Sequence, residues 1–322
     1  MPWSRRTKET LTLFFATDLH GSEKCFLKFL NAAHFYGAEA LILGGDVTGK
    51  ALVPVVRRTD GSHDAEFLGR TAVARREDEL AELEKQIRFN GFYPYRCDAD
   101  ELAAMQADET LRMRRFHEAM RAAVARWMEL ADERLARAGV RCIGMPGNDD
   151  PPYVGELMER SRHVENGDGR VIELAGYQVL SVGHSNLTPW RTPRELPEDA
   201  LEARIEETAR ELLPDRPAIF NLHVPPWESG LDDAPELRAD LSLAGGAAAR
   251  MVPVGSTAVR RAIERHQPVL GLHGHIHESR GAARIGRTLC LNPGSEYNVG
   301  VLRGVLVRLG ERYVLGHQFV AA

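Results

Sequence analysis

The stretch Gly271-Leu272-His273-Gly274-His275-Ile276-His277 carries three imidazoles on alternate residues, directly after an apolar run that begins at Pro268. Alternate residues of an extended chain project to the same side, so His275 and His277 can direct two ring nitrogens to one point. A bare pattern of this kind also arises by chance among unrelated surface histidines. It therefore predicts a metal site only if other strand ends supply acidic, amide and imidazole ligands.

The first two predicted strands both supply such ligands. The apolar run 11–16 is followed by Asp18 and His20, which share one side of the chain at the carboxyl end of the strand, where open α/β sheets hold their ligands. After an intervening predicted helix, the strand 40–43 ends in Gly44-Gly45-Asp46. Strand, helix and strand in this order indicate a parallel crossover. Asp46 is positioned to bridge two ions, and a plain turn is the alternative.

Later predicted strands deliver an amide, two acids and two imidazoles. Asn148 offers a neutral oxygen ligand, whereas its neighbours Asp149 and Asp150 could be ligands or solvated turn acids that cap a following helix. His223 stands where another strand stops, just before two prolines. His184 also follows a strand and could meet a substrate oxygen; a structural or exposed histidine is the alternative.

Together the strand ends offer more donors than one metal ion requires. The set contains only oxygen and nitrogen atoms and no thiolate, which matches a pair of divalent ions such as Mn, Fe or Zn that share a carboxylate. The seven candidate metal ligands are Asp18, His20, Asp46, Asn148, His223, His275 and His277.

Residues 51–139 form the least regular part of the sequence, and we expect a mainly helical insertion there. A hairpin is predicted around Asp60-Gly61. Apolar residues keep helical spacing over 73–87 and again over 116–135, with an aromatic loop, 89–95, between these two helices. The insertion is interpreted as a cap over the site, and a distant packing or dimer arm is the alternative.

Length and composition bound the class of protein. The 322 residues suit one large α/β unit with an insertion or two average domains, and 43% apolar with 27% charged residues is typical of a soluble globular chain. The formal charge of -5 and the pI of about 6.2 argue against a partner of duplex nucleic acid, which needs a dense basic footprint. A small anionic substrate stays open, because bound ions would supply positive charge.

The cysteines and the amino terminus bear on location. Four scattered cysteines without Cys-x-x-Cys spacing indicate neither a zinc knuckle nor a disulfide framework, and a reducing cytoplasm fits best. Residues 1–10 show no apolar core of the secretory type, and no window reaches the roughly 18 apolar residues of a membrane span. We therefore expect a soluble cytoplasmic protein without a membrane partner.

The order Asp-x-His, Gly-Asp, Gly-Asn, His and Gly-His-x-His resembles that of the calcineurin-like metallophosphoesterases. The segments Asp18-Leu19-His20-Gly21-Ser22 and Gly45-Asp46-Val47-Thr48-Gly49-Lys50 are similar to those of prokaryotic Icc-related phosphoesterases. The resemblance covers residues 11–50, 141–150 and 217–295, while the insertion has little share in it. It implies a four-layer α/β/β/α sandwich of two mixed sheets, formed as a single domain over residues 1–322, with the dimetal site at the sheet edges.

The resemblance also implies a ligand set and a reaction. Asp18, His20, Asp46 and His277 would hold the first ion, and Asp46, Asn148, His223 and His275 would hold the second. A metal-bridging hydroxide would attack the phosphorus of a small phosphodiester or phosphomonoester in line, because divalent ions lower the pKa of water toward about 7. Two other functions stay open: a metal-binding interaction scaffold of the same fold, and a nuclease, which would need a basic groove that the net charge does not indicate.

Two positions depart from the family pattern. Gly49 stands where a second acid often follows the bridging Asp, and Asp149 stands where an imidazole commonly assists the leaving group. A carboxylate beside two cations is expected to have a lowered pKa and to be a poor proton donor at neutral pH. Asp149, His184 and His273 are therefore the candidates for protonating the leaving group, and their roles are open.

Overall fold

The computed structural model describes residues 10–238, 240–244 and 250–322. The prediction made for residues 1–10 lies, apart from Thr10, outside them. Within the described chain no helix is both long enough and apolar enough to cross a membrane.

The first of two large sheets contains the strands that deliver Asp18, Asp46 and Asn148. Its order is β20-β19-β1-β2-β7-β8, in which the four neighbours from β1 to β8 are parallel and the last two strands of the chain add an antiparallel pair at one edge. The strands span β1 (Leu11–Ala16), β2 (Ala40–Leu43), β7 (Arg141–Gly144), β8 (Val164–Asn166), β19 (Arg303–Leu309) and β20 (Val314–Ala321).

The second large sheet delivers the three histidines 223, 275 and 277. Its order is β17-β18-β16-β13-β10-β9, with parallel pairs in the centre and one antiparallel pair at each edge. The strands span β9 (Arg170–Leu174), β10 (Tyr177–Val182), β13 (Ala218–Leu222), β16 (Leu270–Leu272), β17 (Gly281–Ile285) and β18 (Thr288–Asn292).

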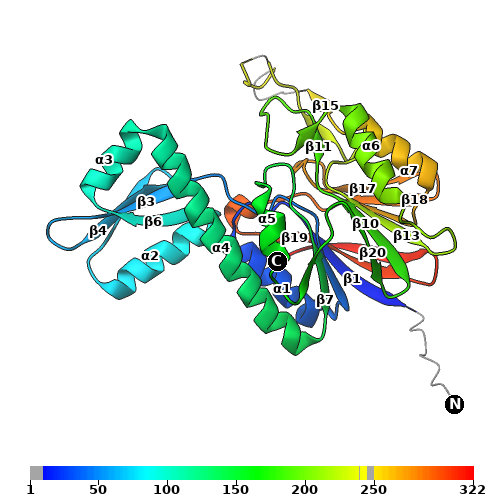
Figure 1. Cartoon of the computed structure of the whole chain (residues 1–322), viewed down its shortest axis with the longest axis horizontal. Helices are drawn as coiled ribbons and strands as arrows, with labels where there is room; N and C mark the ends of the chain where they lie inside the picture. Colours follow the sequence, from blue (N-terminus) through cyan, green and yellow to red (C-terminus); the bar gives the residue numbers. More distant parts are fainter. Residues whose placement is uncertain (1–9, 239, 245–249) are drawn as a thin grey trace.

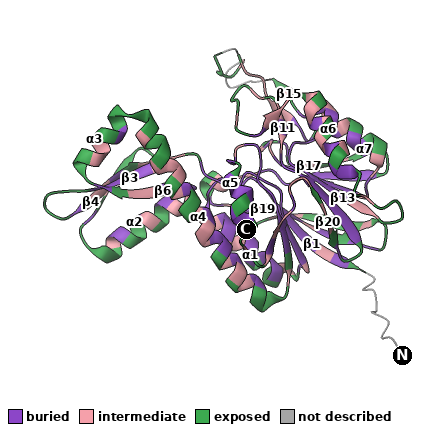
Figure 2. Cartoon of the chain, viewed as in Figure 1, coloured by how far each residue is buried: buried purple, intermediate pink, exposed green. Residues whose placement is uncertain are grey.

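The two sheets pack face to face and helices cover their outer faces (Figures 1 and 2). One buried cluster joins side chains of both sheets, such as Phe15, Ile42 and Ile219. A second lies between the first sheet and its helices, where Phe26 stacks on Trp127 at 4.3 Å between ring centroids. These helices are α1 (Glu23–Tyr36), α4 (Glu109–Ala138) and α5 (Tyr153–Met158), and the second sheet is covered by α6 (Glu198–Ala209) and α7 (Thr257–His266). The predicted four-layer sandwich is confirmed.

Short elements connect the layers near the site. Two small sheets pair β11 (Ser185–Asn186) with β12 (Glu195–Leu196) and β14 (Asp233–Pro235) with β15 (Met251–Pro253). The 3₁₀ turn η2 (Tyr297–Val299) follows β18. Helix α1 begins where the Ser22 hydroxyl accepts from the Cys25 amide and ends at Gly37, which adopts the left-handed conformation that glycine favours.

The insertion forms a lobe that projects from the sandwich (Figure 1). The hairpin at Asp60-Gly61 is present as β3 (Leu52–Arg57) and β4 (His63–Phe67), but the lobe also contains a four-stranded sheet, β5-β4-β3-β6, that the spacing did not predict. Val73 lies in β5 (Arg70–Ala74) instead of a helix, and the end of the expected aromatic loop, residues 93–95, belongs to β6 (Tyr93–Cys97). Helices α2 (Glu77–Phe89) and α3 (Ala99–Ala107) contribute to two separate clusters on this sheet.

Helix α4 belongs to the lobe and to the sandwich. Leu111, near its beginning, packs in a lobe cluster with Met105, whereas Val124, Trp127 and Leu135 are buried against the first sheet. The second half of α4 is thus the crossover helix between the parallel neighbours β2 and β7. The projecting part of the insertion therefore ends inside α4, before residue 139.

Candidate metal centre

The carboxyl ends of β1, β2, β7, β13 and β16 meet at one edge of the two sheets, so all seven predicted ligands come together there. Two main-chain hydrogen bonds join the loop after β1 to the loop after β2. The Asp18 amide donates to the Gly45 carbonyl (3.0 Å), and the His20 amide donates to the Asp46 carbonyl (2.9 Å). A side chain at Gly147 would collide with the Asp46 carboxylate, so this close approach requires glycine.

Four of the seven predicted ligands have a backbone that residues with a side chain rarely adopt. The φ angle is 54° at Asp18, 40° at His20, 48° at Asp46 and 65° at His275. Left-handed backbone at such residues costs of the order of 1 kcal/mol or more each and is found mainly where function requires it. These four residues thus combine an uncommon backbone conformation with side chains whose ligand atoms lie close together.

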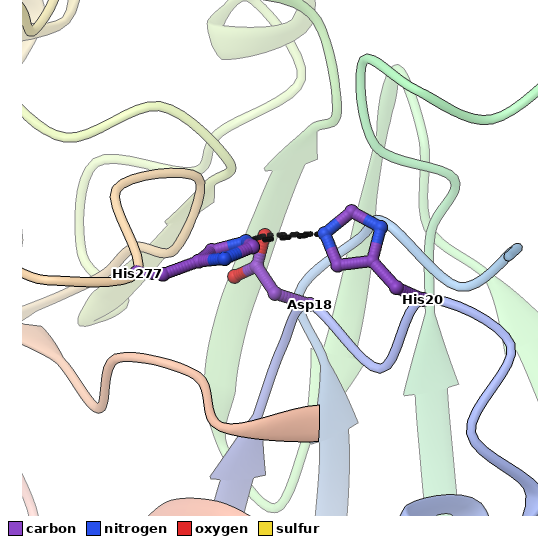
Figure 3. Close-up of side chains that lie close together, drawn as sticks. All are labelled: Asp18, His20 and His277. Atoms are coloured by element: carbon purple, nitrogen blue, oxygen red, sulfur yellow. Dashed lines mark hydrogen bonds and ion pairs between the residues drawn. The ribbon is translucent and has the colours of Figure 1, made fainter. Parts of the chain in front are cut away.

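The first group of donors contains Asp18, His20 and His277 (Figure 3). The two imidazoles face each other, with 3.1 Å between their Nε2 atoms, and Asp18 Oδ1 lies 3.4 Å from Nε2 of His277 and 3.9 Å from Nε2 of His20. All three ligand atoms lie within 4.8 Å of one another. That spacing suits three ligands of a single ion.

The second group contains Asp46, His223 and His275, whose ligand atoms also lie within 4.8 Å of one another. His223 Nε2 lies 3.5 Å from Asp46 Oδ2 and 3.0 Å from the Asn148 side-chain oxygen. The other ring nitrogen of His223 is 2.8 Å from the Gly44 carbonyl oxygen, which fixes the orientation of the ring and leaves Nε2 directed at the centre.

Asp46 lies between the two groups. Its Oδ2 is 3.7 Å from His20 Nε2 on one side and 3.5 Å from His223 Nε2 on the other. Its Oδ1 accepts a hydrogen bond of 3.0 Å from the Asp149 amide, which holds the carboxylate in place. This is the position that a carboxylate shared by two ions has to occupy.

The two buried carboxylates are charged because imidazoles compensate them. Burial opposes ionisation of Asp18, but the hydrogen bond with His277 and the charge of His223 lower its pKa to about 2. Burial likewise opposes ionisation of Asp46, and the neighbouring His223 and His20 shift its pKa well below the usual range. Two buried anions this close together are stable only beside positive charge.

The four imidazoles form two pairs whose pKa values shift in opposite directions. Burial lowers the pKa of His20 to about 3 and that of His275 to about 4, so both rings are neutral at pH 7. Burial acts in the same direction on His223 and His277, but Asp46 raises the pKa of His223 to about 9 and the hydrogen bond with Asp18 raises that of His277. In the chain alone, the protonated ring of His223 supplies positive charge, and the raised pKa of His277 acts in the same direction; divalent ions would supply this charge after displacing the protons. The donor set therefore fits divalent metal ions.

Asp149 lies at the rim of the centre. Its carboxylate is 2.7 Å from Lys50 Nζ and 3.8 Å from His20 Nδ1. Burial and the charge of Asp46 raise the pKa of Asp149 to about 6 against the opposing effect of Lys50. The lowered pKa expected from the sequence concerns a protein with bound cations, which would act in the opposite direction, and it stays a prediction.

The other two candidate proton donors lie differently. His273 is fully buried, its Nδ1 is 2.9 Å from the Leu222 carbonyl oxygen, and its Nε2 has no hydrogen-bond partner among the described residues. His184 is half-buried and its Nδ1 is 3.1 Å from the Arg194 guanidinium; burial and Arg194 lower its pKa to about 4. In the described part of the chain neither ring has a hydrogen bond or ion pair with Asp149.

Asp150 has a role that sequence reasoning did not resolve. Its side chain is fully buried and accepts hydrogen bonds from the amides of Val47 (2.9 Å), Thr48 (2.8 Å) and Gly147 (2.7 Å), and from the Thr48 hydroxyl (2.6 Å). It thereby ties the loop after Asp46 to the loop that carries Asn148. The local signal was only an acid after a glycine and an asparagine, which fits a solvated turn equally well.

Comparison with known proteins adds a distant relative. No protein-family model matches the chain. The uncharacterized protein MJ1162 of Methanocaldococcus jannaschii is 29% identical over 165 residues, which are 50% of this chain and 68% of that protein.

Solved structures align with nearly the whole chain at low identity. One aligns with a TM-score of 0.53 and 14% identity and covers 97% of this chain and 98% of its own. TT1561 of Thermus thermophilus aligns with a TM-score of 0.48 and 15% identity, over 94% of this chain and 100% of its own. A novel archaeal phosphodiesterase aligns with a TM-score of 0.37 and 9% identity, over 97% of this chain and 100% of its own. At such identities the likeness concerns the fold alone.

Fold and site together define a mixed α/β sandwich with a buried cluster of metal-type ligands at one sheet edge. This is the organisation that the resemblance to the calcineurin-like metallophosphoesterases implied.

Proposed function

We propose that the protein is a phosphoesterase that binds two divalent metal ions and hydrolyses a small phosphodiester or phosphomonoester. The observation that carries the proposal is the position of Asp46 between two groups of buried donors, 3.7 Å from His20 and 3.5 Å from His223. When bound, two divalent ions polarise phosphoryl oxygens and lower the pKa of water. Mn, Fe and Zn suit the oxygen and nitrogen donors.

The residues of the chain would divide the remaining tasks. Asp18, His20 and His277 hold one position and His223, His275 and Asn148 hold the other, with Asp46 common to both. Lys50, whose side chain is 57% exposed, presents an ammonium at the rim, where it can pair with a phosphoryl oxygen. The fixed main-chain turns keep these groups in place before substrate arrives, which removes reorganisation from the reaction.

A metal-uptake experiment tests the proposal. The purified protein is stripped with chelator and titrated with Mn while bound metal and hydrolysis of p-nitrophenyl phosphoesters are measured. We expect close to two ions per chain and activity that depends on them, because the donor set exceeds the needs of one ion. An absence of metal uptake would favour an interaction scaffold of the same fold.

A pair of variants tests the shared position of Asp46. Asp46→Asn should reduce activity more than His20→Ala does, because Asp46 alone would neutralise positive charge between the two ions. The number of Mn ions bound by each variant is the parallel readout. Equal and small losses in both variants would contradict the two-ion assignment.

A further inference from the structure

A cavity of about 410 Å³ opens beside the candidate metal centre. It lies between the turn that follows β16 and the loop that follows β18, and His277, one of the predicted ligands, forms part of its wall. The side chain of His277 is 27% exposed, so the centre and the cavity meet at this ring. His277 therefore belongs both to the first group of donors and to the wall of the cavity.

The walls of the cavity are fixed relative to the centre. The fully buried Asn292 donates to the Ile276 carbonyl (2.9 Å) and accepts from the Gly294 amide (2.8 Å), which joins the two loops. The Ser295 hydroxyl donates to the main-chain oxygen of Asp18 at 2.7 Å. The loop that lines the cavity is thus held by the same residue that offers a ligand to the first ion position.

Tyr297 is close to both the donors and the cavity. Its ring lies 4.6 Å from the ring of His20 and 5.9 Å from that of His277, measured between centroids, and it is one of the residues that line the cavity. A flat ring in this position limits where the part of a substrate that leaves the centre can pass.

The charged residues of the cavity are not equivalent. Arg303 is engaged, because its guanidinium binds Glu296 with contacts of 2.8 and 2.6 Å. Arg280 forms no ion pair within the described part of the chain, although its charge helps to lower the pKa of Glu296, and its guanidinium lies over the Phe319 ring at 4.9 Å from the centroid. Stacking on an aromatic face orients a guanidinium and leaves its donors available. Glu278 on the rim keeps the cavity from being generally cationic.

We propose that this cavity binds the part of the substrate that is not attacked, and that Arg280 pairs there with an anionic group, a carboxylate or a second phosphate, on that part. The proposal rests on the proposed function, since it takes the reacting phosphoryl group to lie at the metal centre. Arg280 would then be a specificity-determining residue that contacts substrate outside the reacting atoms.

Matched diesters test the proposal in the Mn-loaded protein. Each carries p-nitrophenol as the leaving group and, as the second substituent, an alkyl chain of graded length that ends in either a carboxylate or a hydroxyl. The variants are Arg280→Gln, Arg280→Lys and, as the matched control, Arg308→Gln at an exposed position of β19 outside the cavity. Thermal unfolding of each variant checks that the fold is retained.

The native protein should prefer the carboxylate series at one chain length. Arg280→Gln should raise KM for that ester by about ten- to a hundredfold, the effect of losing one hydrogen bond to a charged group, with kcat and the hydroxyl series unchanged. Arg280→Lys should restore part of the preference, and Arg308→Gln should leave it intact. Equal KM values for both series in the native protein, or an equal loss for both in Arg280→Gln, would overturn the proposal.

A binding measurement separates failure of this proposal from failure of the proposed function. Calorimetry with alkyl phosphates that end in a carboxylate or a hydroxyl reports on the cavity without turnover. If none of the diesters is hydrolysed, tighter binding of the carboxylate form that is lost in Arg280→Gln still supports the assignment of the cavity. Equal binding of the two forms would overturn it.

Discussion

The ammonium of Lys50 lies 2.7 Å from the carboxylate of Asp149, so an ion pair stands at the rim of the centre, at the position where the family that the sequence resembles commonly has an imidazole. His20 Nδ1 is the nearest ring nitrogen to that carboxylate, at 3.8 Å, and belongs to a predicted ligand. The arrangement places a cation for phosphoryl oxygens next to an acid whose nearest imidazole, among the described residues, belongs to a predicted metal ligand. Its consequence concerns the leaving group.

We expect esters with an acidic leaving group to react much faster than alkyl esters, because p-nitrophenolate leaves without a proton. Asp149→His should raise the rates of alkyl esters by part of the roughly 10²- to 10⁴-fold that general acid catalysis supplies, and change p-nitrophenyl rates little. The measurement is log kcat/KM against leaving-group pKa. Asp149→Asn is the control that removes the carboxylate without adding an imidazole. A shallow slope in the native protein would mean that His184, His273 or another group already donates the proton.

The lobe can be tested as a cap only by a deletion that spares the second half of α4. Replacing residues 52–111 with a flexible linker keeps Val124 and Trp127, which are buried against the first sheet. We expect the shortened protein to bind two ions and to gain activity on bulky diesters relative to p-nitrophenyl phosphate, since a cap limits substrate size.

Tyr93→Phe is a milder control for the same question. The Gly49 amide donates to the Tyr93 hydroxyl at 2.8 Å, and this contact joins the lobe to the loop that carries Asp46. The variant should weaken that junction and leave the lobe in place. If the protein that lacks residues 52–111 hydrolyses the same substrates in the same order of preference as the native protein, the lobe is a packing or association arm.

Asp150→Ala should lower the free energy of unfolding by about 3 kcal/mol, because several donors that the carboxylate now satisfies would be left buried without a partner. Metal affinity should fall as well, since Asp150 joins the loops of Asp46 and Asn148. Urea unfolding and Mn titration measure the two effects. Asp78→Ala, at a side chain that is 73% exposed, is the control and should be nearly neutral. A loss below about 1 kcal/mol for Asp150→Ala would contradict this role.

The sandwich and the convergence of the donors could be predicted because both follow from local patterns. Short apolar runs that end in Asp18, Asp46 or His223 identify strands and their carboxyl ends, and parallel strands bring those ends to one edge. The roles of these residues as metal ligands stay predictions until metal binding is measured.

Other features depend on contacts that no local pattern encodes. Val73 fitted a helical spacing, but it lies in β5, where pairing with Asp64 on β4 decides the structure. Asp150 looks like a turn residue, and only the approach of Val47 from a distant loop buries it. The pairing of Lys50 with Asp149 likewise joins residues that lie far apart in the sequence.

Helix α4 has thirty residues and so extends over roughly 45 Å at about 1.5 Å per residue. One end packs with Met105 in the lobe and the other carries Trp127 into the sandwich. Because the helix is continuous, unfolding of its first turns in the lobe exposes the later turns that cover the first sheet. The lobe and the sandwich should therefore melt cooperatively. Heating the native protein should therefore produce one heat-absorption peak, although the chain looks like two bodies.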